Sequence, residues 1–202
     1  MQLGFYFDQS RCSNCLACVV ACKDWNDIPS GDVFWRWVIT IEEGEFPNLD
    51  VSFLSASCYH CEDAPCIAEC PVEAITKRDS DGIVVVDSDA CLGRDQCGVC
   101  RDACPYGAPR FGHEADSKMQ KCNFCLERID AGVAKGLKPG VDREATPACV
   151  NTCQGRALTF GDLDDPDSEV RRLIREKRAF QLHPDYDTDP SIYYIDDGRI
   201  GD

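Results

Sequence analysis

The stretch that decides the fold of this chain reads Cys58-Tyr-His-Cys61-Glu-Asp-Ala-Pro-Cys66-Ile-Ala-Glu-Cys70-Pro71. Three cysteines lie close together, and a fourth cysteine follows after a short gap and directly precedes a proline. Ferredoxin-type loops bind iron–sulfur clusters with this pattern, because the first three thiolates hold one cluster and the fourth reaches a different one. A segment of this kind cannot complete either cluster alone. We therefore expect further cysteine motifs elsewhere in the chain.

The 16 cysteines of the chain fall into four motifs. In chain order the motifs are Cys12, Cys15, Cys18 and Cys22; Cys58, Cys61, Cys66 and Cys70; Cys91, Cys97, Cys100 and Cys104; and Cys122, Cys125, Cys149 and Cys153. Motif one has the spacing of bacterial two-cluster ferredoxins. Motif four is split by residues 126–148. The pattern predicts four 4Fe-4S clusters with all sixteen cysteines as iron ligands.

Motif three has a longer first gap than motif one, and an ordinary gap would place Arg94 at the ligand position. Arginine does not ligate iron, so two alternatives remain. Either Cys91 reaches the cluster over a longer loop, or Asp95 or solvent takes the fourth position. A thiolate is the softer ligand and suits iron–sulfur iron better, which favours Cys91.

The composition disfavours several other classes of protein. The chain has 36 acidic and 21 basic residues and a formal charge of −15, whereas nucleic-acid binding requires a basic face. No apolar run approaches the roughly 20 residues that cross a bilayer. The segment from Met1 to Asp8 has neither the basic nor the apolar region of a signal peptide, so a secreted disulfide scaffold is not expected. Structural zinc also uses paired cysteines, but seldom with a fourth cysteine before proline.

Local patterns predict the main strands. Residues 3–8 alternate apolar and polar side chains and predict a short strand. Residues 33–42 are rich in aromatic and β-branched side chains, and residues 51–54 form the expected returning strand of a hairpin. Residues 82–87 predict a buried strand, and residues 191–195 either add an edge strand or lie across a partner.

Helices are expected after Cys18 and over residues 124–131. A third helix is predicted over residues 166–178, with Asp165 as its cap and Pro166 at its first position. This helix is the only basic segment of an acidic chain, and either a solvated face or a docking element accounts for its basic residues. His60 lies inside motif two, and we expect it to hydrogen-bond solvent or backbone rather than ligate iron. For Trp35 and Trp37 we expect packing roles.

An internal repeat connects motifs two and four. Gln154-Gly-Arg-Ala-Leu158, which follows Cys153, mirrors Pro71-Val-Glu-Ala-Ile75, which follows Cys70. The repeat indicates two ferredoxin-like units in one chain. The predicted fold is therefore α+β, with two 4Fe-4S dicluster units, a β-hairpin insertion and a C-terminal extension.

With all four motifs placed, the sequence closely resembles the four-cluster iron–sulfur subunits of molybdopterin oxidoreductases of the dimethyl sulfoxide reductase family. The resemblance covers nearly the whole chain. The length of the chain and residues 46–49 are most similar to the polysulfide and arsenate reductase branch. Motif three instead resembles the small subunits of the transhydroxylase and aromatic hydroxylase branch. Beyond motif two, the matching stretches are residues 81–87 (Asp-Gly-Ile-Val-Val-Val-Asp), 104–109 (Cys-Pro-Tyr-Gly-Ala-Pro), 121–125 (Lys-Cys-Asn-Phe-Cys), 147–153 (Pro-Ala-Cys-Val-Asn-Thr-Cys) and 160–163 (Phe-Gly-Asp-Leu).

The resemblance also implies how the ligands combine. Motifs one and four would share two clusters, and motifs two and three the other two. The implied sets are Cys12, Cys15, Cys18 and Cys153; Cys122, Cys125, Cys149 and Cys22; Cys58, Cys61, Cys66 and Cys104; and Cys91, Cys97, Cys100 and Cys70. The implied domains are residues 1–30 with 110–165, residues 55–109, a hairpin at residues 31–54, and a C-terminal helix and tail at residues 166–202.

The resemblance implies an electron-transfer subunit that passes electrons between a molybdenum or tungsten bis-pterin catalytic subunit and an external donor, acceptor or membrane quinone subunit. No substrate-catalytic residues are expected, because no nucleophile–base pair stands out. A cytoplasmic location is expected, or an extracytoplasmic one through co-export with a partner bearing a twin-arginine signal. Alternatives are a polyferredoxin-like subunit of a hydrogenase, formate dehydrogenase or flavin enzyme, and a zinc-stabilised interaction protein.

Overall fold

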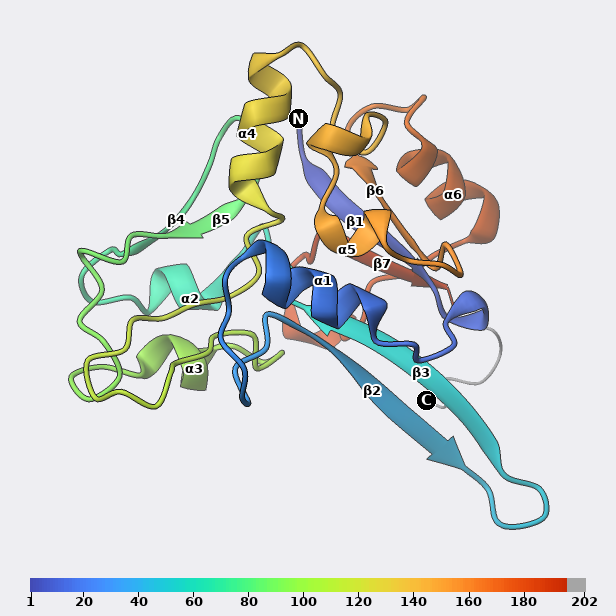
Figure 1. Ribbon diagram of the computed structural model, residues 1–202, viewed down its shortest axis with the longest axis horizontal. Helices are drawn as coiled ribbons and strands as arrows, with labels where there is room; N and C mark the ends of the chain where they lie inside the picture. Colours follow the sequence, from blue (N-terminus) through green and yellow to red (C-terminus); the bar gives the residue numbers. More distant parts are fainter. Residues whose placement is uncertain (196–202) are drawn as a thin grey trace.

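The computed structural model describes residues 1–195 and shows a mixed α/β fold (Figure 1). Its central strand is β1 (Leu3–Asp8), which pairs antiparallel with β6 (Leu158–Asp162) and parallel with β7 (Ile192–Ile195). The predicted strands at residues 3–8 and 191–195 are confirmed, and β7 is the edge strand that the sequence indicated. All six residues of β1 are buried, so both faces of the strand contribute to the core. Alternation along the sequence did not predict this burial.

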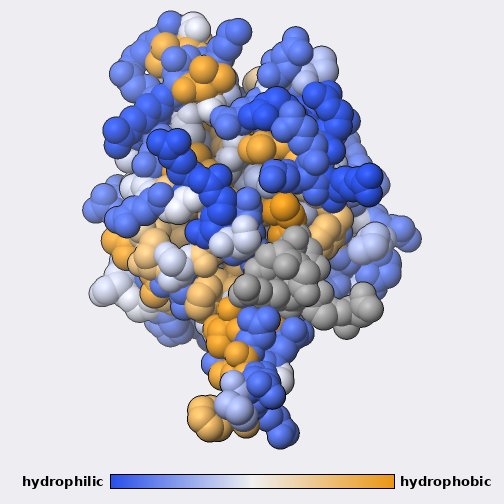
Figure 2. All heavy atoms as spheres, turned by 90° about the vertical axis from the view of Figure 1, so that its right-hand side faces the viewer, coloured by the Kyte–Doolittle hydropathy of each residue, from blue (hydrophilic) through white to orange (hydrophobic). Residues whose placement is uncertain are grey.

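The second sheet is the hairpin of β2 (Arg36–Glu43) and β3 (Asp50–Ser57), which pair antiparallel from Arg36↔Ser57 to Glu43↔Asp50. Its far end projects from the body of the protein (Figure 1). Figure 2 shows hydrophobic side chains along this projection, where Phe46 is 94% exposed at the turn. The near end is buried, and Leu54 of β3 and Ile41 of β2 also pack into the main core.

A third sheet contains β4 (Ile75–Lys77) and β5 (Val84–Val86) in antiparallel pairing. The strand predicted over residues 82–87 is present as β5, whereas β4 was not predicted. β4 begins five residues after Cys70 and directly follows the turn that ends motif two. Its shortness left no apolar alternation for the sequence to display.

Each cysteine motif contains a short helix. These helices are α1 (Ala17–Trp25), α2 (Pro65–Ala68), α3 (Val99–Ala103) and α5 (Ala148–Asn151). In every case the third cysteine of the motif is the second residue of the helix. The helix after Cys18 was predicted and is confirmed. Helix α1 packs against α5, and α2 packs against α3, so the helices of motif one meet those of motif four and the helices of motif two meet those of motif three.

Two further helices lie outside the cysteine motifs, α4 (Leu126–Ala134) against the 3₁₀ turn at Arg143–Ala145 and α6 (Glu169–Lys177) against a sheet. α4 confirms the helix expected over residues 124–131. α6 packs on β6 and β1, but it begins later than predicted. Its cap is Ser168, whose hydroxyl accepts a hydrogen bond from the Arg171 amide at 3.2 Å. The prediction of an Asp165 cap was wrong because the Asp165 carboxylate accepts from the Asp167 amide in a preceding turn.

Short 3₁₀ turns at Gln9–Arg11, Arg143–Ala145 and Pro184–Tyr186 complete the described chain. Among residues 1–195, no helix combines the length and apolarity needed to cross a bilayer. The last seven residues of the expected C-terminal tail, 196–202, lie outside the described residues.

Motif one meets motif four through a close backbone approach as well as through helices. A Cβ atom on Gly155, two residues after Cys153, would lie 2.3 Å from the carbonyl oxygen of Arg11, just before Cys12. No side chain fits in that space. Glycine therefore allows the end of motif four to lie directly against the start of motif one.

Candidate iron–sulfur sites

Three small cavities are each lined by four cysteines. We call them site A, with Cys12, Cys15, Cys18 and Cys153; site B, with Cys58, Cys61, Cys66 and Cys104; and site C, with Cys70, Cys91, Cys97 and Cys100. The three cavities are small and of similar size. Each wall takes three cysteines from one motif and one from another. Their similar size and lining indicate one kind of occupant.

The remaining four cysteines, Cys22, Cys122, Cys125 and Cys149, form site D, and all four are buried. Burial raises the pKa of the Cys22 thiol, and the neighbouring thiols of Cys122, Cys149 and Cys125 raise it further. That mutual influence places the fourth cysteine of motif one among three cysteines of motif four. The structure thus gathers all sixteen predicted ligands into four groups of four.

The geometry of these groups fits a polynuclear cluster better than a single ion. A structural zinc site needs four ligands within about 2.3 Å of one point. Within residues 1–195, no three His, Cys, Asp or Glu side chains converge closely enough to hold one metal ion. The cysteines at sites A, B and C instead line the wall of a small cavity. This arrangement suits a cubane, whose irons lie at separate corners.

Burial keeps the thiols of these sites hard to ionise in the absence of a metal. Burial, followed by the charge of nearby cysteines, raises the pKa of Cys61 and Cys66 to about 12 and that of Cys100 to about 11. Thiols with such pKa values stay protonated at neutral pH. A coordinating metal removes this proton, since the thiolate is the ligand. The groups are therefore arranged for an occupant that draws negative charge into a buried space.

Site C includes Cys91, the residue at the irregular start of motif three. The charge of Cys97, Cys91 and Cys70 acts on Cys100, and Cys91 lines the same cavity. Asp95 is exposed and absent from the cavity wall, and its amide donates to the Ala115 carbonyl at 3.1 Å. Of the two alternatives for the fourth position, the geometry favours Cys91.

The fourth cysteine of each motif accepts a hydrogen bond from the residue four positions later. The donors are the backbone amides of Ala74 to Cys70 (3.3 Å), Ala108 to Cys104 (3.5 Å) and Ala157 to Cys153 (3.2 Å), and the side-chain amide of Asn26 to Cys22 (3.8 Å). Such donors stabilise negative charge on sulfur and tune the potential of a cluster. The alanines shared by the repeat after Cys70 and Cys153 were the sequence signal for this feature, which went unrecognised.

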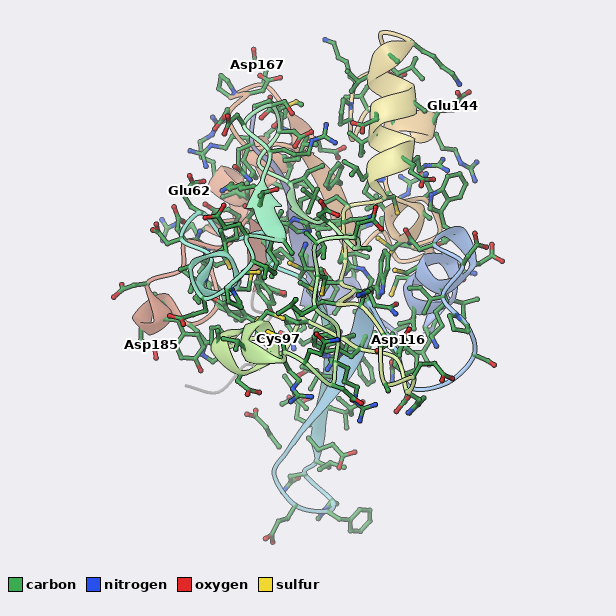
Figure 3. All side chains as sticks on the ribbon, turned by 90° about the vertical axis from the view of Figure 1, so that its left-hand side faces the viewer. Glu62, Cys97, Asp116, Glu144, Asp167 and Asp185 are labelled. Carbon is green, nitrogen blue, oxygen red and sulfur yellow. The ribbon has the colours of Figure 1, made fainter. Side chains whose placement is uncertain are left out.

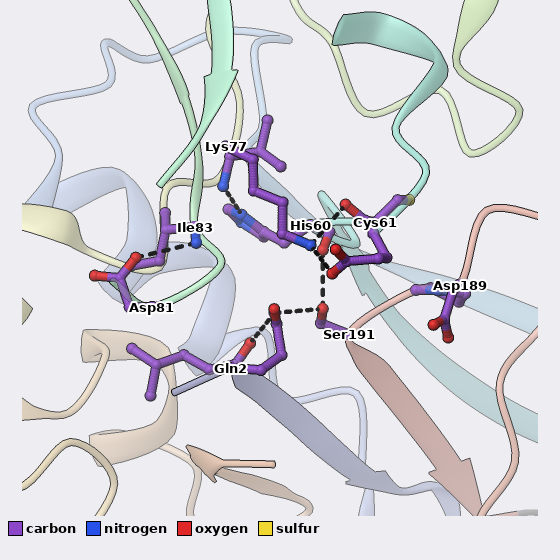
Figure 4. Close-up of polar contacts among 12 residues, drawn as sticks. Gln2, His60, Cys61, Lys77, Asp81, Ile83, Asp189 and Ser191 are labelled. Carbon is purple, nitrogen blue, oxygen red and sulfur yellow. Dashed lines mark hydrogen bonds and ion pairs between the residues drawn. The ribbon is translucent and has the colours of Figure 1, made fainter. Parts of the chain in front are cut away.

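The loop of motif two is attached to strands far away in the sequence (Figure 4). The Ser191 hydroxyl donates to the His60 carbonyl at 2.8 Å and accepts from the Gln2 side chain at 2.9 Å. Lys77 donates to the Cys61 carbonyl at 3.3 Å and also pairs with Glu62. These contacts fix site B against β1 and β7.

His60 has the hydrogen-bonding role that the sequence predicted. Its Nδ1 accepts from the Val84 amide at 2.9 Å, and the ring lies 3.7 Å from that of Phe124, measured between centroids. Burial lowers the pKa of His60 well below its ordinary value, which keeps the ring neutral. The cavity of site B does not include it.

The tryptophans have the expected packing roles. The Trp35 indole packs against the main core and donates to Gln120 Oε1 at 3.1 Å, and the Arg110 guanidinium lies 4.7 Å from the centre of the Trp37 ring.

The acidic charge is spread over the surface rather than gathered at the sites. Figure 3 labels exposed examples on separate elements, among them Glu62, Asp116, Glu144, Asp167 and Asp185.

Comparison with known proteins agrees with this geometry. The 4Fe-4S dicluster domain family matches residues 49–163. A subunit of the sulfite dehydrogenase of Allochromatium vinosum is 40% identical, with 96% of this chain and 82% of the relative covered. This chain belongs to the 4Fe-4S dicluster family of iron–sulfur subunits.

Other relatives place it in the dimethyl sulfoxide reductase family, as the sequence indicated. The arsenate respiratory reductase iron–sulfur subunit of Shewanella sp. strain ANA-3 is 31% identical, with 96% of both chains covered. One chain of the anaerobic dimethyl sulfoxide reductase of Escherichia coli K12 is 41% identical over 81% of this chain and 75% of its own. The iron–sulfur subunit described here is an electron-transfer subunit that carries four 4Fe-4S clusters.

Proposed function

We propose that this subunit passes single electrons between a molybdopterin catalytic subunit and an external donor, an external acceptor or a membrane quinone subunit, through clusters held at sites A, B, C and D. The observation that carries the proposal is the gathering of the cysteines. Each site combines three cysteines of one motif with the fourth cysteine of another. This is the arrangement by which two-cluster ferredoxins keep neighbouring clusters close.

Each site, when loaded, supplies a one-electron redox centre. The chain's own residues hold its position, exclude water from it and set its potential. The buried cysteines and the apolar cavity walls provide the exclusion, and the N–H donors of Ala74, Ala108 and Ala157 provide part of the tuning. No side chain of this subunit needs to act on a substrate in this scheme.

The packing of the helices supports two ferredoxin-like units. Since α1 meets α5, residues 1–30 and 110–165 would form the unit with sites A and D. Since α2 meets α3, residues 55–109 would form the unit with sites B and C. The hairpin near residues 31–54 and the segment at residues 166–202 would be additions to these units. All sixteen cysteines would be ligands, including Cys91 rather than Asp95.

The partner follows from the named relatives, which are subunits of a sulfite dehydrogenase, an arsenate respiratory reductase and a dimethyl sulfoxide reductase. A molybdenum or tungsten catalytic subunit would therefore bind this subunit, and a membrane anchor subunit would complete a respiratory complex. The subunit itself would not enter the membrane or bind nucleic acid. Its compartment would be that of its catalytic partner, cytoplasmic or reached by co-export.

The test is metal analysis of the complex purified anaerobically from its native host, with the partner identified from its sequence. We expect about sixteen irons per copy of this subunit, beyond those of the partner, and one molybdenum or tungsten. An iron content of about twelve per subunit would show that one of the four sites holds no cluster. Iron without molybdenum or tungsten would assign the subunit to a hydrogenase or flavin enzyme, and zinc in place of iron would refute the proposal.

A further inference from the structure

Arg36 is a buried cation without an acidic partner. It is the first residue of β2, and its side chain is among the most buried in the protein, at 2% exposure. Arginine is almost never fully buried unless it is paired. Among residues 1–195, however, none of the ion pairs involves Arg36. A lone buried charge costs several kcal/mol, roughly, so another source of negative charge must face it.

Neutral groups position the guanidinium. Its Nη1 donates to the Ser55 hydroxyl at 2.9 Å and its Nη2 to the Ser57 hydroxyl at 3.2 Å, both on the neighbouring strand β3. The guanidinium carbon lies 4.7 Å from the centre of the Phe5 ring. The remaining donor, Nε, is buried and has no hydrogen-bond partner among the described residues. These contacts hold the cation in place but leave its charge uncompensated.

The groups around Arg36 that become negative are cysteine sulfurs, which are thiolates once they ligate iron. Burial acts to lower the pKa of Arg36, but thiolate charge outweighs it and raises the pKa above its ordinary value. The thiolates responsible are those of Cys149, Cys122, Cys18 and Cys22. Three of these belong to site D, and Cys18 belongs to site A. Arg36 therefore stands between two of the four sites.

A hydroxyl links the cation to site A directly. Ser55 accepts a hydrogen bond from Arg36, which leaves its own O–H free to donate into site A, where Cys18 lies. Ser55 also lines the cavity of site A. Ser57, by contrast, donates to the Cys58 carbonyl at 3.4 Å and not to a sulfur. The influence of Arg36 on site B is thus weaker than its influence on sites A and D.

We propose that Arg36 supplies a fixed positive charge shared by sites A and D, and that this charge raises the reduction potentials of the clusters held there. The proposal rests on the ligand sets given under the proposed function. Adding an electron makes a four-thiolate site more negative, and a nearby cation in a low-dielectric interior favours that state. The charge comes from the hairpin rather than from a cysteine motif.

The experiment is a potentiometric titration of the anaerobically purified complex, followed by electron paramagnetic resonance. Arg36→Met removes the charge, and Arg36→Lys keeps it. Arg172→Met, on the exposed face of α6, is the matched surface control because its guanidinium pairs only with Glu169 and Glu176 among the described residues. Iron content is measured for every variant.

With Arg36→Met, we expect the ratio of reduced to oxidised cluster at a fixed potential to fall about tenfold for two of the four clusters, a midpoint shift of about 59 mV to lower potential. The other two midpoints should stay unchanged. Arg36→Lys and Arg172→Met should leave all four near their wild-type values. Unchanged midpoints in an Arg36→Met complex with full iron would overturn the proposal, as would an equal shift of all four.

If the Arg36→Met complex fails to assemble, the iron contents of two further variants decide the question. In that case Arg36→Gln, which keeps hydrogen bonding to the serines without the charge, is compared with Arg36→Lys. Full iron in the lysine variant and iron loss in both neutral variants would support a requirement for charge. Iron loss in all three variants would show that the shape of the arginine side chain is required rather than its charge, and would overturn the proposal. An iron content in the wild-type complex well below about sixteen would instead refute the ligand sets themselves.

Discussion

The side-chain amide of Asn26 lies 3.8 Å from the sulfur of Cys22, in the role that a backbone amide has at the other three motifs. The difference follows from α1. Cys22 lies inside this helix, so the backbone amide of Asn26 is already used by the Cys22 carbonyl at 3.2 Å. A side chain provides the donor instead. Unlike a backbone amide, this donor can be removed by substitution.

Asn26→Leu is therefore predicted to lower the potential of the cluster at site D alone. Asn26 Nδ2 donates to the carbonyl oxygen of Cys22 at 2.8 Å as well as to its sulfur, so the substitution removes a donor from one ligand of site D. We expect a shift of some tens of millivolts, because one neutral hydrogen bond contributes about 1 kcal/mol. Potentiometry of the intact complex measures it. Asn26→Gln, which keeps an amide, is the control, and a shift at any other site would contradict the assignment.

The fourth cysteine of each motif belongs to a site whose other three cysteines come from a different motif. This arrangement predicts which double variants lose one cluster and which lose two. Cys153→Ser and Cys12→Ser both affect site A, so the double variant should retain about twelve of about sixteen irons, like either single variant. Cys153→Ser combined with Cys122→Ser affects sites A and D and should retain about eight. Equal iron in the two double variants would refute the sets. Iron and labile sulfide analysis of the purified complexes makes the comparison.

Cys91 and Asp95 are predicted to differ sharply as ligands of site C. Cys91→Ala should remove up to about four irons, or about one if a three-iron cluster survives, whereas Asp95→Asn should keep the full complement. The reason is that Cys91 lines the cavity with Cys70, Cys97 and Cys100, while Asp95 is exposed outside it. The opposite result would show that the longer loop brings a carboxylate to iron.

Alkaline pH is predicted to destabilise the protein partly through Tyr6. Burial, and then the nearby Asp8 carboxylate, raises the pKa of Tyr6 to about 12. A raised pKa favours the protonated tyrosine in the folded state, so its stabilising effect is complete below about pH 10 and is lost as pH rises to about 12. Tyr6→Phe should weaken this loss. The midpoint of thermal unfolding, measured against pH under anaerobic conditions, tests it.

At neutral pH, Tyr6→Phe is expected to be neutral or stabilising, by about 1 kcal/mol at most. The hydroxyl of Tyr6 is buried without a hydrogen-bond partner among the described residues, while its ring packs with Val170 and Ile174 of α6. Phenylalanine keeps that packing. A marked loss of stability at neutral pH would show that the hydroxyl has a partner.

Much of the candidate site could be predicted because its information is local. Cysteine spacing identifies the cluster type and the ligands of each motif, since a short loop must wrap three thiolates around one cluster. The strand at Leu3–Asp8 and the helix after Cys18 are likewise encoded in a few adjacent residues. The start of α6 was misplaced because Pro166 and Ser168 both offer an acceptable helix beginning, and only the turn at Asp165 separates them.

The sequence by itself predicted which residues would bind iron, and it indicated the number of clusters and the family to which the subunit belongs. Only the tertiary structure decided that helices α1 and α5 and helices α2 and α3 meet, that Cys91 lines site C, and that Arg36 lies between sites A and D. In the sequence, Arg36 is an ordinary polar residue of a strand between two tryptophans. The physical reason is range: thiolate spacing is fixed by covalent geometry over a few residues, whereas a buried charge acts on groups that only folding brings near it.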